Sequence, residues 1–376
     1  MKNDNCCPNH GNHSMKKYGS SSSADASENK RKHDELATGY SDGYEPLEAL
    51  DLSKVKTVND LVTRMGKCSF GARNVGEAAD VLETMVKDKD CFKVLTLSGA
   101  MTAAKMGLVI CDMIDDGMID AVVSTGALMA HGFVESVGMR HFKYKWDMND
   151  EELYEKGYDR IYDTLELEHN LDEVAEIVNK VLDKADSKET LCSFRINQML
   201  GEYLAKNTKG RGILKSAYEK KVPVYVPAFT DSEVGLDVAL HNRRRKIDGK
   251  QVLNFNPFFD LEDFTERVRN AKKIGIFTIG GGVPRNWAQQ GACYLDLINS
   301  RIGSGGDFKR YNYAVRICPE PVHWGGLSGC NYSESVSWGK IVPKSEGGQY
   351  VEVFDDATIA WPMIVKAVQE RLGIKR

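Results

Sequence analysis

Most of the chain alternates short apolar runs with longer segments in which apolar residues recur every three or four positions. The short runs are typical of buried strands, and the longer segments of helices that bury one face. Strands separated by helices over this length indicate a parallel sheet that is covered on both faces. We therefore expect an α/β fold, a Rossmann-like doubly wound parallel sheet with helices on both faces. The expected strands span residues 93–98, 121–125, 222–227, 274–279, 313–318 and 351–354. The expected helices span residues 57–65, 74–87, 102–116, 171–184, 192–206, 213–220, 261–272, 284–299 and 357–372, and the charged section 147–169 is expected to leave the sheet.

The first 44 residues differ in composition from the rest of the chain. They are rich in Ser, Asn, Lys and Asp and show no hydrophobic period, so we expect a disordered N-terminal tail at residues 1–44. Residues 45–376 then form a single α/β domain. Within the tail, Cys6, Cys7, His10 and His13 carry metal-binding groups, but their spacing matches no standard zinc pattern. No metal site is expected.

Charge and hydropathy argue against several classes of protein. The formal net charge of -4 disfavours a nucleic-acid-binding protein, and the basic run 243–246 is interpreted as a solvated loop. No stretch reaches the ~18 continuous apolar residues that a membrane span needs. The first forty residues lack the apolar run of a signal peptide. The nine cysteines are scattered and odd in number, as expected for free thiols in the cytoplasm.

Small residues follow three of the expected strands, at the sheet edge where ligands bind in such folds. Backbone N–H groups at these turns can approach a phosphate, and the N-terminus of the next helix favours the anion. Glycines also close ordinary strand-to-helix turns, and none of the turns carries a G-x-G-x-x-G fingerprint. The residues alone therefore leave nucleotide binding open. The turns contain Ser98 and Gly99; Thr125, Gly126 and Ala127; and Gly280, Gly281 and Gly282.

A lysine near the C-terminus follows a tryptophan and a glycine, in the order Trp338-Gly339-Lys340. Most lysines are solvated at the protein surface, and Lys340 can be interpreted as one of them. An indole wall that excludes water would instead disfavour the ammonium form and leave a neutral amine able to form a Schiff base. Glu334 is either a solvated loop acid or a group that anchors a substrate ammonium or moves a proton.

The stretch around Glu334, Trp338 and Lys340 resembles the signature of the deoxyhypusine synthase family. The likeness runs from about residue 74 to the C-terminus and includes the blocks 124–126, 227–231, 280–284 and 355–357. It implies that Lys340 carries a covalent imine, and that the protein is a homotetramer with NAD at the subunit interfaces. The residues that match the family's NAD contacts are Ser98, Gly99, Thr102, Thr125, Gly126, Ala127, Asp231, Gly282, Asp356 and Ala357.

The resemblance implies transfer of a 4-aminobutyl group from a polyamine such as spermidine, or from putrescine. A hydride passes from the carbon beside the amine to NAD⁺, and neutral Lys340 attacks the resulting iminium and expels diaminopropane when spermidine is the donor. An acceptor amine then displaces the lysine, and the retained NADH returns the hydride to the new imine, so NAD is regenerated within one cycle. Trp338 offers a wall against water and a face for substrate cations. The acceptor is a protein lysine, on a partner similar to translation factor 5A, or a small amine.

Several positions that hold the polyamine in the family's eukaryotic members differ in this chain. A histidine that contacts the polyamine in those members aligns with Trp287. Three carboxylate residues that contact it align with His131, Leu236 and Leu327. Glu135 and Asp237 are the nearest carboxylates to the first two of these. Each lost carboxylate removes an ammonium partner worth ~1–3 kcal/mol in a partly buried site, so the amine that is recognised stays open. The candidate substrate-binding residues are Glu334, Trp338, His131, Trp287, His323 and Trp324, although a buried histidine satisfied by backbone groups is an equal interpretation of His131.

Three other functions compete with transfer to a protein lysine. A homospermidine synthase would use putrescine as the acceptor and would tolerate the altered polyamine positions. A regulatory paralogue would bind NAD without transferase activity, but the presence of Lys340 argues against it. An NAD-dependent amine dehydrogenase would release NADH, whereas a transferase consumes no NAD overall.

Overall fold

The computed structural model describes residues 36–304, 306, 308–326 and 328–375. These fall into two units, one that ends at Pro46 and one that begins at Leu47. The described part of the first unit contains one turn of 3-10 helix, η2 (Tyr40–Asp42). Most of the expected tail, including Cys6, Cys7, His10 and His13, lies outside the described residues, so the disorder of residues 1–44 stays a prediction.

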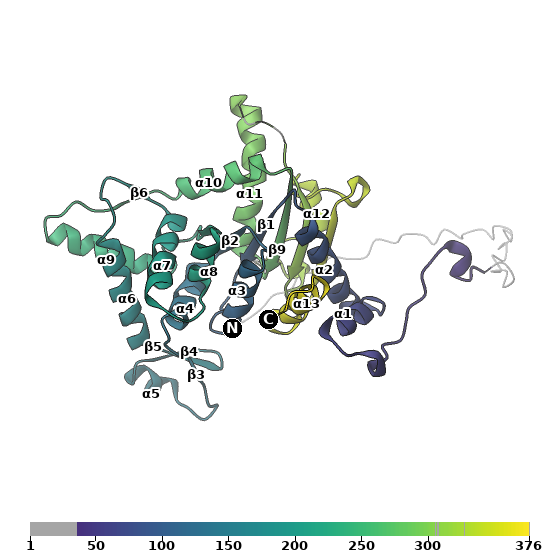
Figure 1. Ribbon diagram of the computed structural model, residues 1–376, viewed down its shortest axis with the longest axis horizontal. Coiled ribbons are helices and arrows are strands. Elements are labelled where there is room, and N and C mark those ends of the chain that lie inside the picture. Colours follow the sequence, from purple (N-terminus) through teal and green to yellow (C-terminus); the bar gives the residue numbers. More distant parts are fainter. Residues whose placement is uncertain (1–35, 305, 307, 327, 376) are drawn as a thin grey trace, which may run out of the picture. The chain divides into compact units, whose positions relative to one another are not determined.

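The second unit is built around a six-stranded sheet in the order β11-β10-β9-β1-β2-β7, with every neighbouring pair parallel (Figure 1). The chain runs from the central strand β1 outward through β2 to β7. It then returns to the other side of β1 and runs through β9 and β10 to β11. This reversal makes the sheet doubly wound, which confirms the expected fold class. The strands are β1 (Cys91–Leu97), β2 (Ala121–Ser124), β7 (Val224–Tyr225), β9 (Lys273–Ile279), β10 (Tyr311–Ile317) and β11 (Gln349–Val353).

Thirteen α-helices are described, most of them around the sheet. Several begin at side-chain caps, such as Thr57 with Asp60 at the start of α1 and Asp356 at the start of α13. The helices are α1 (Val58–Gly66), α2 (Phe70–Lys87), α3 (Gly107–Asp115), α4 (Gly126–Ser136), α5 (Asp150–Glu155), α6 (Glu168–Leu182), α7 (Ser193–Asn207), α8 (Ile213–Lys220), α9 (Glu233–Ile247), α10 (Phe258–Asn270), α11 (Gly282–Ile302), α12 (Tyr332–Ser337) and α13 (Ala357–Arg371).

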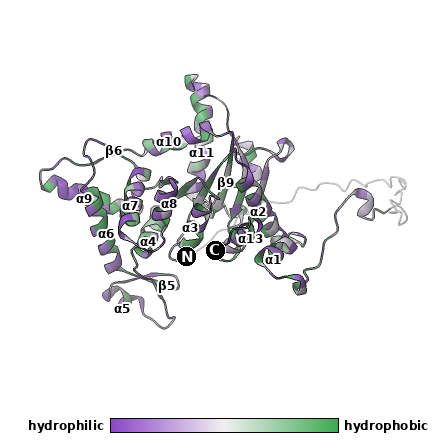
Figure 2. Cartoon of the chain, viewed as in Figure 1, coloured by the Kyte–Doolittle hydropathy of each residue, from purple (hydrophilic) through white to green (hydrophobic). Residues whose placement is uncertain are grey.

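Alternate residues of the strands bury into two cores, one on each face of the sheet. Leu95 and Leu97 join the larger core, to which α2, α3 and α13 contribute. Val94 joins the second core, where Phe264 of α10 and Leu295 of α11 are buried. Both faces of the sheet are therefore covered, and Figure 2 shows hydrophobic colouring along the central strands.

The charged section 147–169 leaves the main sheet, as expected. It supplies α5 and most of a small antiparallel sheet in the order β3-β5-β4, formed by β3 (Phe142–Lys143), β4 (Tyr158–Ile161) and β5 (Thr164–Leu167). A second small sheet pairs β6 (Thr190–Leu191) with β8 (Asn254–Phe255).

The structure corrects several boundaries. The strand expected at residues 222–227 is reduced to β7, because Pro223 and Pro227 flank it and proline cannot donate to a sheet. The helix expected from residue 102 begins at Gly107, after a turn in which Lys105 has φ 66°. Neither α4 nor α9 was expected. The basic run 243–246 belongs to the C-terminal end of α9 rather than to a loop, where its charge complements the helix dipole.

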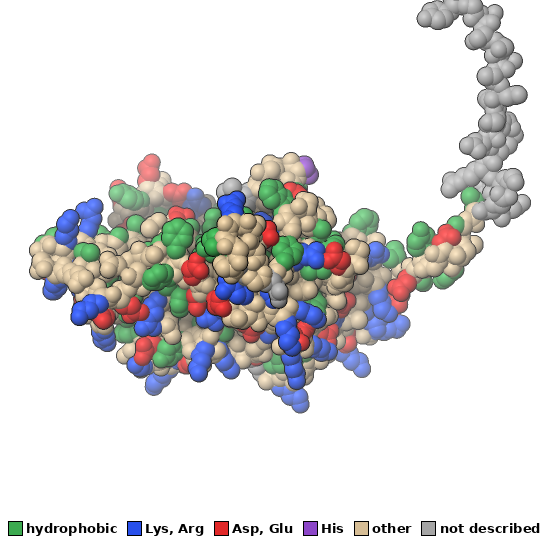
Figure 3. Space-filling view, turned by 90° about the horizontal axis from the view of Figure 1, so that it is seen from above, with side chains coloured by type: hydrophobic (Ala, Val, Ile, Leu, Met, Phe, Trp, Pro, Cys, Tyr) green, Lys and Arg blue, Asp and Glu red, His purple; other side chains and the backbone are tan. Residues whose placement is uncertain are grey.

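The described residues also bear on the class of protein. No helix there combines the length and the apolar character needed to cross a membrane. All seven described cysteines are free thiols, as expected. On the face seen in Figure 3, Lys and Arg side chains are interspersed with Asp and Glu rather than gathered in one stripe.

Candidate functional site

A cavity of about 510 Å³ lies at the carboxyl ends of the central strands, beside the point where the strand order reverses. In doubly wound sheets this is where ligands bind. Two helix N-termini open toward the cavity, since α4 begins at Gly126 and α11 at Gly282. The wall includes Ser98, Thr125, Gly126, Asp231, Gly282 and Glu320.

The turn after β9 packs too closely against its surroundings for any residue but glycine. The Ser98 hydroxyl accepts a hydrogen bond from the Gly281 N–H at 3.0 Å and donates one to the Ile279 carbonyl at 3.2 Å. A Cβ atom added at Gly281 would lie 2.3 Å from the carbonyl oxygen of Ser328. Gly280 has φ 76°, a conformation that side chains disfavour. The glycines thus bring backbone to the cavity wall at the start of α11.

The donor set of this cavity fits a dinucleotide. Thr125 Oγ1 is buried and has no hydrogen-bond partner in the described part of the chain, and such an atom needs an acceptor or donor from elsewhere. The helix N-termini suit a pyrophosphate. Asp231 is exposed on the cavity wall, where its carboxylate could accept hydrogen bonds from ribose hydroxyls.

Five of the residues expected to contact NAD do not line this cavity. The buried Thr102 hydroxyl donates to the carbonyl of Leu128 at 2.8 Å and so ties the turn after β1 to α4. Asp356 caps α13, where its Oδ1 accepts from the Thr358 N–H at 2.6 Å. The NAD contacts of these residues stay predictions. The five residues are Gly99, Thr102, Ala127, Asp356 and Ala357.

The backbone of Lys340 is fixed by the end of α12 and the start of β10. Gly339, with φ 68°, turns the chain after the helix. The Lys340 N–H donates to the Ser335 carbonyl at 3.1 Å, and its carbonyl accepts from the Tyr311 N–H at 2.9 Å. The side chain therefore starts from a rigid position.

The Lys340 amine reaches α11, where Nζ donates to Oδ1 of Asn286 at 3.0 Å. Nζ also lies 5.9 Å from the ring centroid of Trp338, within reach of a cation–π interaction. The indole is 67% exposed, so within one chain it does not form the closed wall that the sequence suggested. Asn286 was not among the predicted residues, because no local pattern connects it to a lysine 54 positions later.

Lys340 lines two further cavities, of about 320 Å³ and 540 Å³. The smaller one shares Gly282, Val283 and Ser328 with the cavity at the strand ends. Glu334 and Asp296 are among the residues that line the larger one. Lys340 therefore lies between the cavity at the strand ends and the larger cavity, which is lined by two anionic residues.

Two buried arginines hold the loop that separates these cavities. Arg285 donates to the carbonyls of Ser328 and Cys330 at 3.0 Å and 2.7 Å. Arg316 donates to the Gly280 carbonyl at 3.0 Å and pairs with Glu352 at 3.2 Å. Charge-assisted bonds of this kind are strong. Arg316, a charged residue inside the otherwise apolar end of β10, is the sequence signal that points to this frame.

Three predicted substrate-binding residues lie away from Lys340. Trp287 packs in the second core, with its ring centroid 5.6 Å from that of Tyr225 and 5.0 Å from that of Phe264. His323 and Trp324 lie on η4 (Val322–Trp324) and line none of the three cavities. Leu327 lies outside the described residues.

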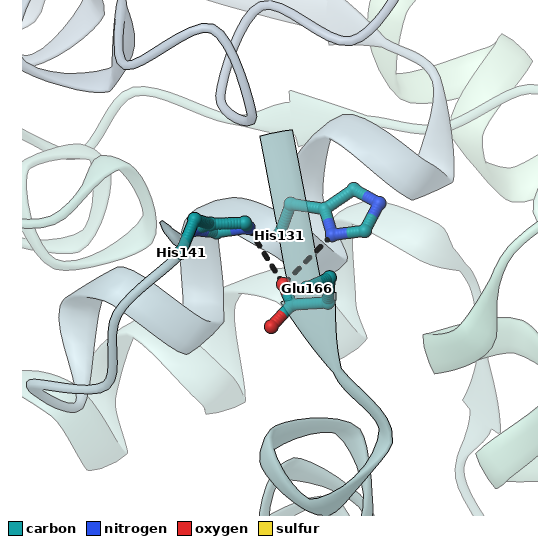
Figure 4. Close-up of side chains that lie close together, drawn as sticks. All are labelled: His131, His141 and Glu166. Carbon is teal, nitrogen blue, oxygen red and sulfur yellow. Dashed lines mark hydrogen bonds and ion pairs between the residues drawn. The ribbon is translucent and has the colours of Figure 1, made fainter. Parts of the chain in front are cut away.

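His131 points into a buried network with His141 and Glu166 (Figure 4). Its Nδ1 lies 3.2 Å from Oε2 of Glu166, and Nε2 of His141 lies 2.6 Å from the same oxygen. Although burial opposes it, the hydrogen bond to His131 and the close ion-pair contact with His141 hold the pKa of Glu166 far below its usual range. Glu135 contacts Lys105 at the edge of this network.

Asp237, the carboxylate next to Leu236 in the sequence, is buried on α9 and lines none of the three cavities described above. Burial, with Glu233 as the nearest like charge, raises its pKa to about 6 from the ordinary 3.8. Well below pH 3.8 the carboxyl is protonated in both folded and unfolded chains, and above pH 6 folding must bury a charge. We expect Asp237→Asn to raise the free energy of unfolding by ~1–3 kcal/mol at pH 7.5 and by almost nothing at pH 3. Urea denaturation at the two pH values measures this, and an equal effect at both would show that burial of charge is not the cause.

Comparison with known proteins gives consistent matches over most of the chain. A family model for deoxyhypusine synthase matches residues 60–368. A "Probable deoxyhypusine synthase 2" of Methanosarcina acetivorans is 36% identical over 322 residues, covering 85% of this chain and 88% of the relative. A "Deoxyhypusine synthase-like protein" of Chlorobaculum parvum is 34% identical over 327 residues, with 85% and 88% covered. A crystal structure described as a "putative deoxyhypusine synthase" from Entamoeba histolytica aligns with a TM-score of 0.54 at 16% identity, over 85% of this chain and 96% of that one, and so shows the shared fold.

Proposed function

The chain belongs to the deoxyhypusine synthase family, and on that basis we propose that it is an NAD-dependent aminobutyltransferase that works through an imine on Lys340. The family supports an enzyme of the transferase kind. NAD, the lysine imine and the amine substrates are part of the proposal. The observation that carries it is the shared wall of Gly282, Val283 and Ser328, which sets the Lys340 amine beside the cavity that fits a dinucleotide.

The first cavity would hold NAD. Backbone N–H groups at the start of α11 and α4 would bind the pyrophosphate, the Thr125 hydroxyl would gain a partner, and Asp231 would accept from ribose. When bound, NAD supplies reversible hydride removal at the carbon beside the substrate amine. The close contact of Gly281 with Ser328 keeps this wall fixed.

Asn286 orients the nucleophile. Its Oδ1 accepts one N–H of Lys340 and cannot take the proton, so the nitrogen lone pair of the neutral amine is left for the substrate. Glu334 lines the same 540 Å³ cavity, where its carboxylate would receive a proton from the attacking or incoming amine. Trp338 offers its ring face to a substrate cation.

The amines that react are set by the charges in the larger cavity. Glu334 and Asp296 are two anionic groups that could each bind an ammonium, and they compensate for the carboxylates missing at His131 and Leu236. Spermidine and putrescine are the proposed donors. The acceptor is a protein lysine, on a partner similar to translation factor 5A, or putrescine, which would make the protein a homospermidine synthase.

A regulatory paralogue without activity is disfavoured because Lys340, the residue that would form the imine, is present and lines both cavities beside Asn286. Assembly as a homotetramer in the cytoplasm also belongs to the proposal. The exposed indole of Trp338 beside the lysine is a surface that a second copy could cover.

Product analysis separates these functions. The protein is incubated with NAD⁺ and either spermidine or putrescine, and released diaminopropane, new polyamines and net NADH are quantified. A transferase yields amine products with no net NADH, and added putrescine yields homospermidine if a small amine is the acceptor. NADH formed in proportion to amine consumed would identify a dehydrogenase instead.

Substitution of Asn286 tests its role as a positioning residue. We expect Asn286→Ala to lower kcat by about tenfold, the effect of one lost hydrogen bond, while the affinity for NAD stays unchanged. Asn286→Asp places a carboxylate 3.0 Å from the amine and favours the ammonium, so its defect should be larger at neutral pH and should shrink as the pH rises. Steady-state kinetics across pH measure both. Parallel pH profiles for wild type and Asn286→Asp would contradict the assignment.

A further inference from the structure

We propose that His131, His141 and Glu166 form a binding site for a divalent transition-metal ion, with Zn²⁺ as the occupant that the ligands suit best. This site is separate from Lys340 and does not depend on the proposed transferase activity. One donor atom from each residue, Nδ1 of His131, Nε2 of His141 and a Glu166 oxygen, lies within 4.8 Å of the others. Two imidazoles and one carboxylate are a common protein ligand set for zinc.

The three ligands come from three different segments that meet at one point. His131 lies on α4, His141 in the turn before β3, and Glu166 on β5. All three residues are buried, and the Glu166 side chain is fully enclosed. Figure 4 shows both rings directed at the Glu166 carboxylate. The fold thus brings three buried ligands together, and a water molecule would take the fourth position of a tetrahedral ion.

The distances are close to those that a zinc ion requires. Bonds of 2.0–2.1 Å in a tetrahedron place neighbouring donor atoms about 3.3 Å apart. The 3.2 Å between His131 Nδ1 and Glu166 Oε2 already matches this spacing. The 2.6 Å between His141 Nε2 and Oε2 must widen by about 0.7 Å. A modest movement of the His141 turn is therefore sufficient.

The hydrogen bonds around the ligands leave the inward-facing atoms available. Glu166 Oε1 accepts from Asn170 Nδ2 at 2.7 Å and from the Leu167 N–H at 3.0 Å, which fixes the carboxylate. Although His141 Nε2 lies near Oε2, it is buried without a partner in hydrogen-bond geometry among the described residues. Fixed outer contacts and an unsatisfied inner nitrogen are what a metal site needs.

Two charged groups face the site from outside. Lys105 Nζ lies 2.8 Å from His141 Nδ1, and Glu135 Oε1 lies 3.6 Å from the same nitrogen. With an ion on Nε2, Nδ1 carries the proton and would donate to Glu135, the usual outer partner of a metal-bound histidine. Lys105 opposes the ion by charge, but its side chain is 49% exposed and can turn toward solvent.

An ion here would join α4 to the small β3-β5-β4 sheet. Since α4 begins at the candidate NAD cavity, the ion would stabilise that wall without contacting a substrate. The expected role is stability rather than chemistry.

Metal analysis of the full chain tests the proposal. The chelator-treated protein is titrated with Zn²⁺, dialysed and assayed for zinc, and its Tm is measured with and without the ion. We expect one zinc per chain and a higher Tm. His131→Gln and His141→Gln should each weaken binding by about 100-fold or more, whereas the matched change at the exposed His169, His169→Gln, should not. Replacement of Cys6, Cys7, His10 and His13 together should also leave the zinc bound.

Cobalt substitution is measured on wild-type protein, so this test does not depend on whether the histidine variants fold. Co²⁺ bound to wild-type protein at this site should show the visible bands of a nitrogen and oxygen ligand set, without a thiolate charge-transfer band. A thiolate band, or zinc that disappears when the four tail residues are replaced, would place the ion elsewhere and overturn the proposal. Failure of wild-type protein to retain zinc, with no change in Tm, would also overturn it and leave the trio as a hydrogen-bonded network.

Discussion

Replacement of Lys340 by arginine is expected to lower aminobutyl transfer by roughly 10³-fold or more, the loss seen when a covalent nucleophile is removed. Arginine keeps the positive charge and the stem but is not deprotonated in proteins, so it cannot attack the substrate. Diaminopropane release from spermidine measures the effect. Binding of NAD should be unchanged, because Lys340 does not line the cavity at the strand ends.

Lys344→Arg is the matched control for this change. Lys344 lies four positions later, with Nζ 5.0 Å from the ring centroid of Tyr350, and lines neither cavity beside Asn286. It should retain wild-type activity. If Lys340→Arg kept more than about a tenth of the wild-type rate, the lysine would not be the nucleophile.

Replacement of Gly281 by alanine is expected to weaken NAD binding by about 100-fold, as a displacement near 1 Å in a binding wall can do. The new Cβ atom would lie 2.3 Å from the Ser328 carbonyl oxygen, so either the turn or the loop must move. Arg285 holds the loop through the Ser328 carbonyl and Arg316 holds the turn through the Gly280 carbonyl, which makes the displacement costly. Isothermal titration with NAD⁺ measures the change.

Gly210→Ala controls for the general cost of adding a methyl group, because nothing lies within 4 Å of a Cβ atom there. It should bind NAD as wild type does. Circular dichroism of Gly281→Ala checks that the chain still folds. A folded Gly281→Ala protein with wild-type affinity would mean that NAD does not use this turn.

Much of the fold follows from local patterns. Five of the six strands of the sheet were expected close to their observed positions, because continuous apolar runs mark strands that are buried on both faces. The helix α4 was missed since nearly all its residues are buried and it has no polar face to reveal a period. The strand β7 is shorter than its apolar run predicts, because prolines flank it on both sides.

The candidate site was less predictable, because its contacts join distant segments. Ser98 and Gly281 follow two adjacent parallel strands and lie side by side. This proximity can be expected from the sequence, because residues that follow parallel strands meet at the carboxyl edge of the sheet. No such rule connects Lys340 to Asn286. Trp287 was assigned to the substrate by alignment; it packs against a core beside Tyr225 and Phe264, and its contact with substrate stays a prediction. The partner of His131, Glu166, likewise lies on a separate strand.

The central claim is that Lys340 forms an imine with an aminobutyl group, and borohydride trapping tests it most directly. Protein incubated with NAD⁺ and spermidine, or with putrescine, is reduced with borohydride, digested and mapped by mass spectrometry. We predict an aminobutyl adduct on the peptide that contains Lys340, absent from Lys340→Arg, with at least one of the two amines. The absence of any adduct with both amines, from protein that binds NAD, would contradict the account.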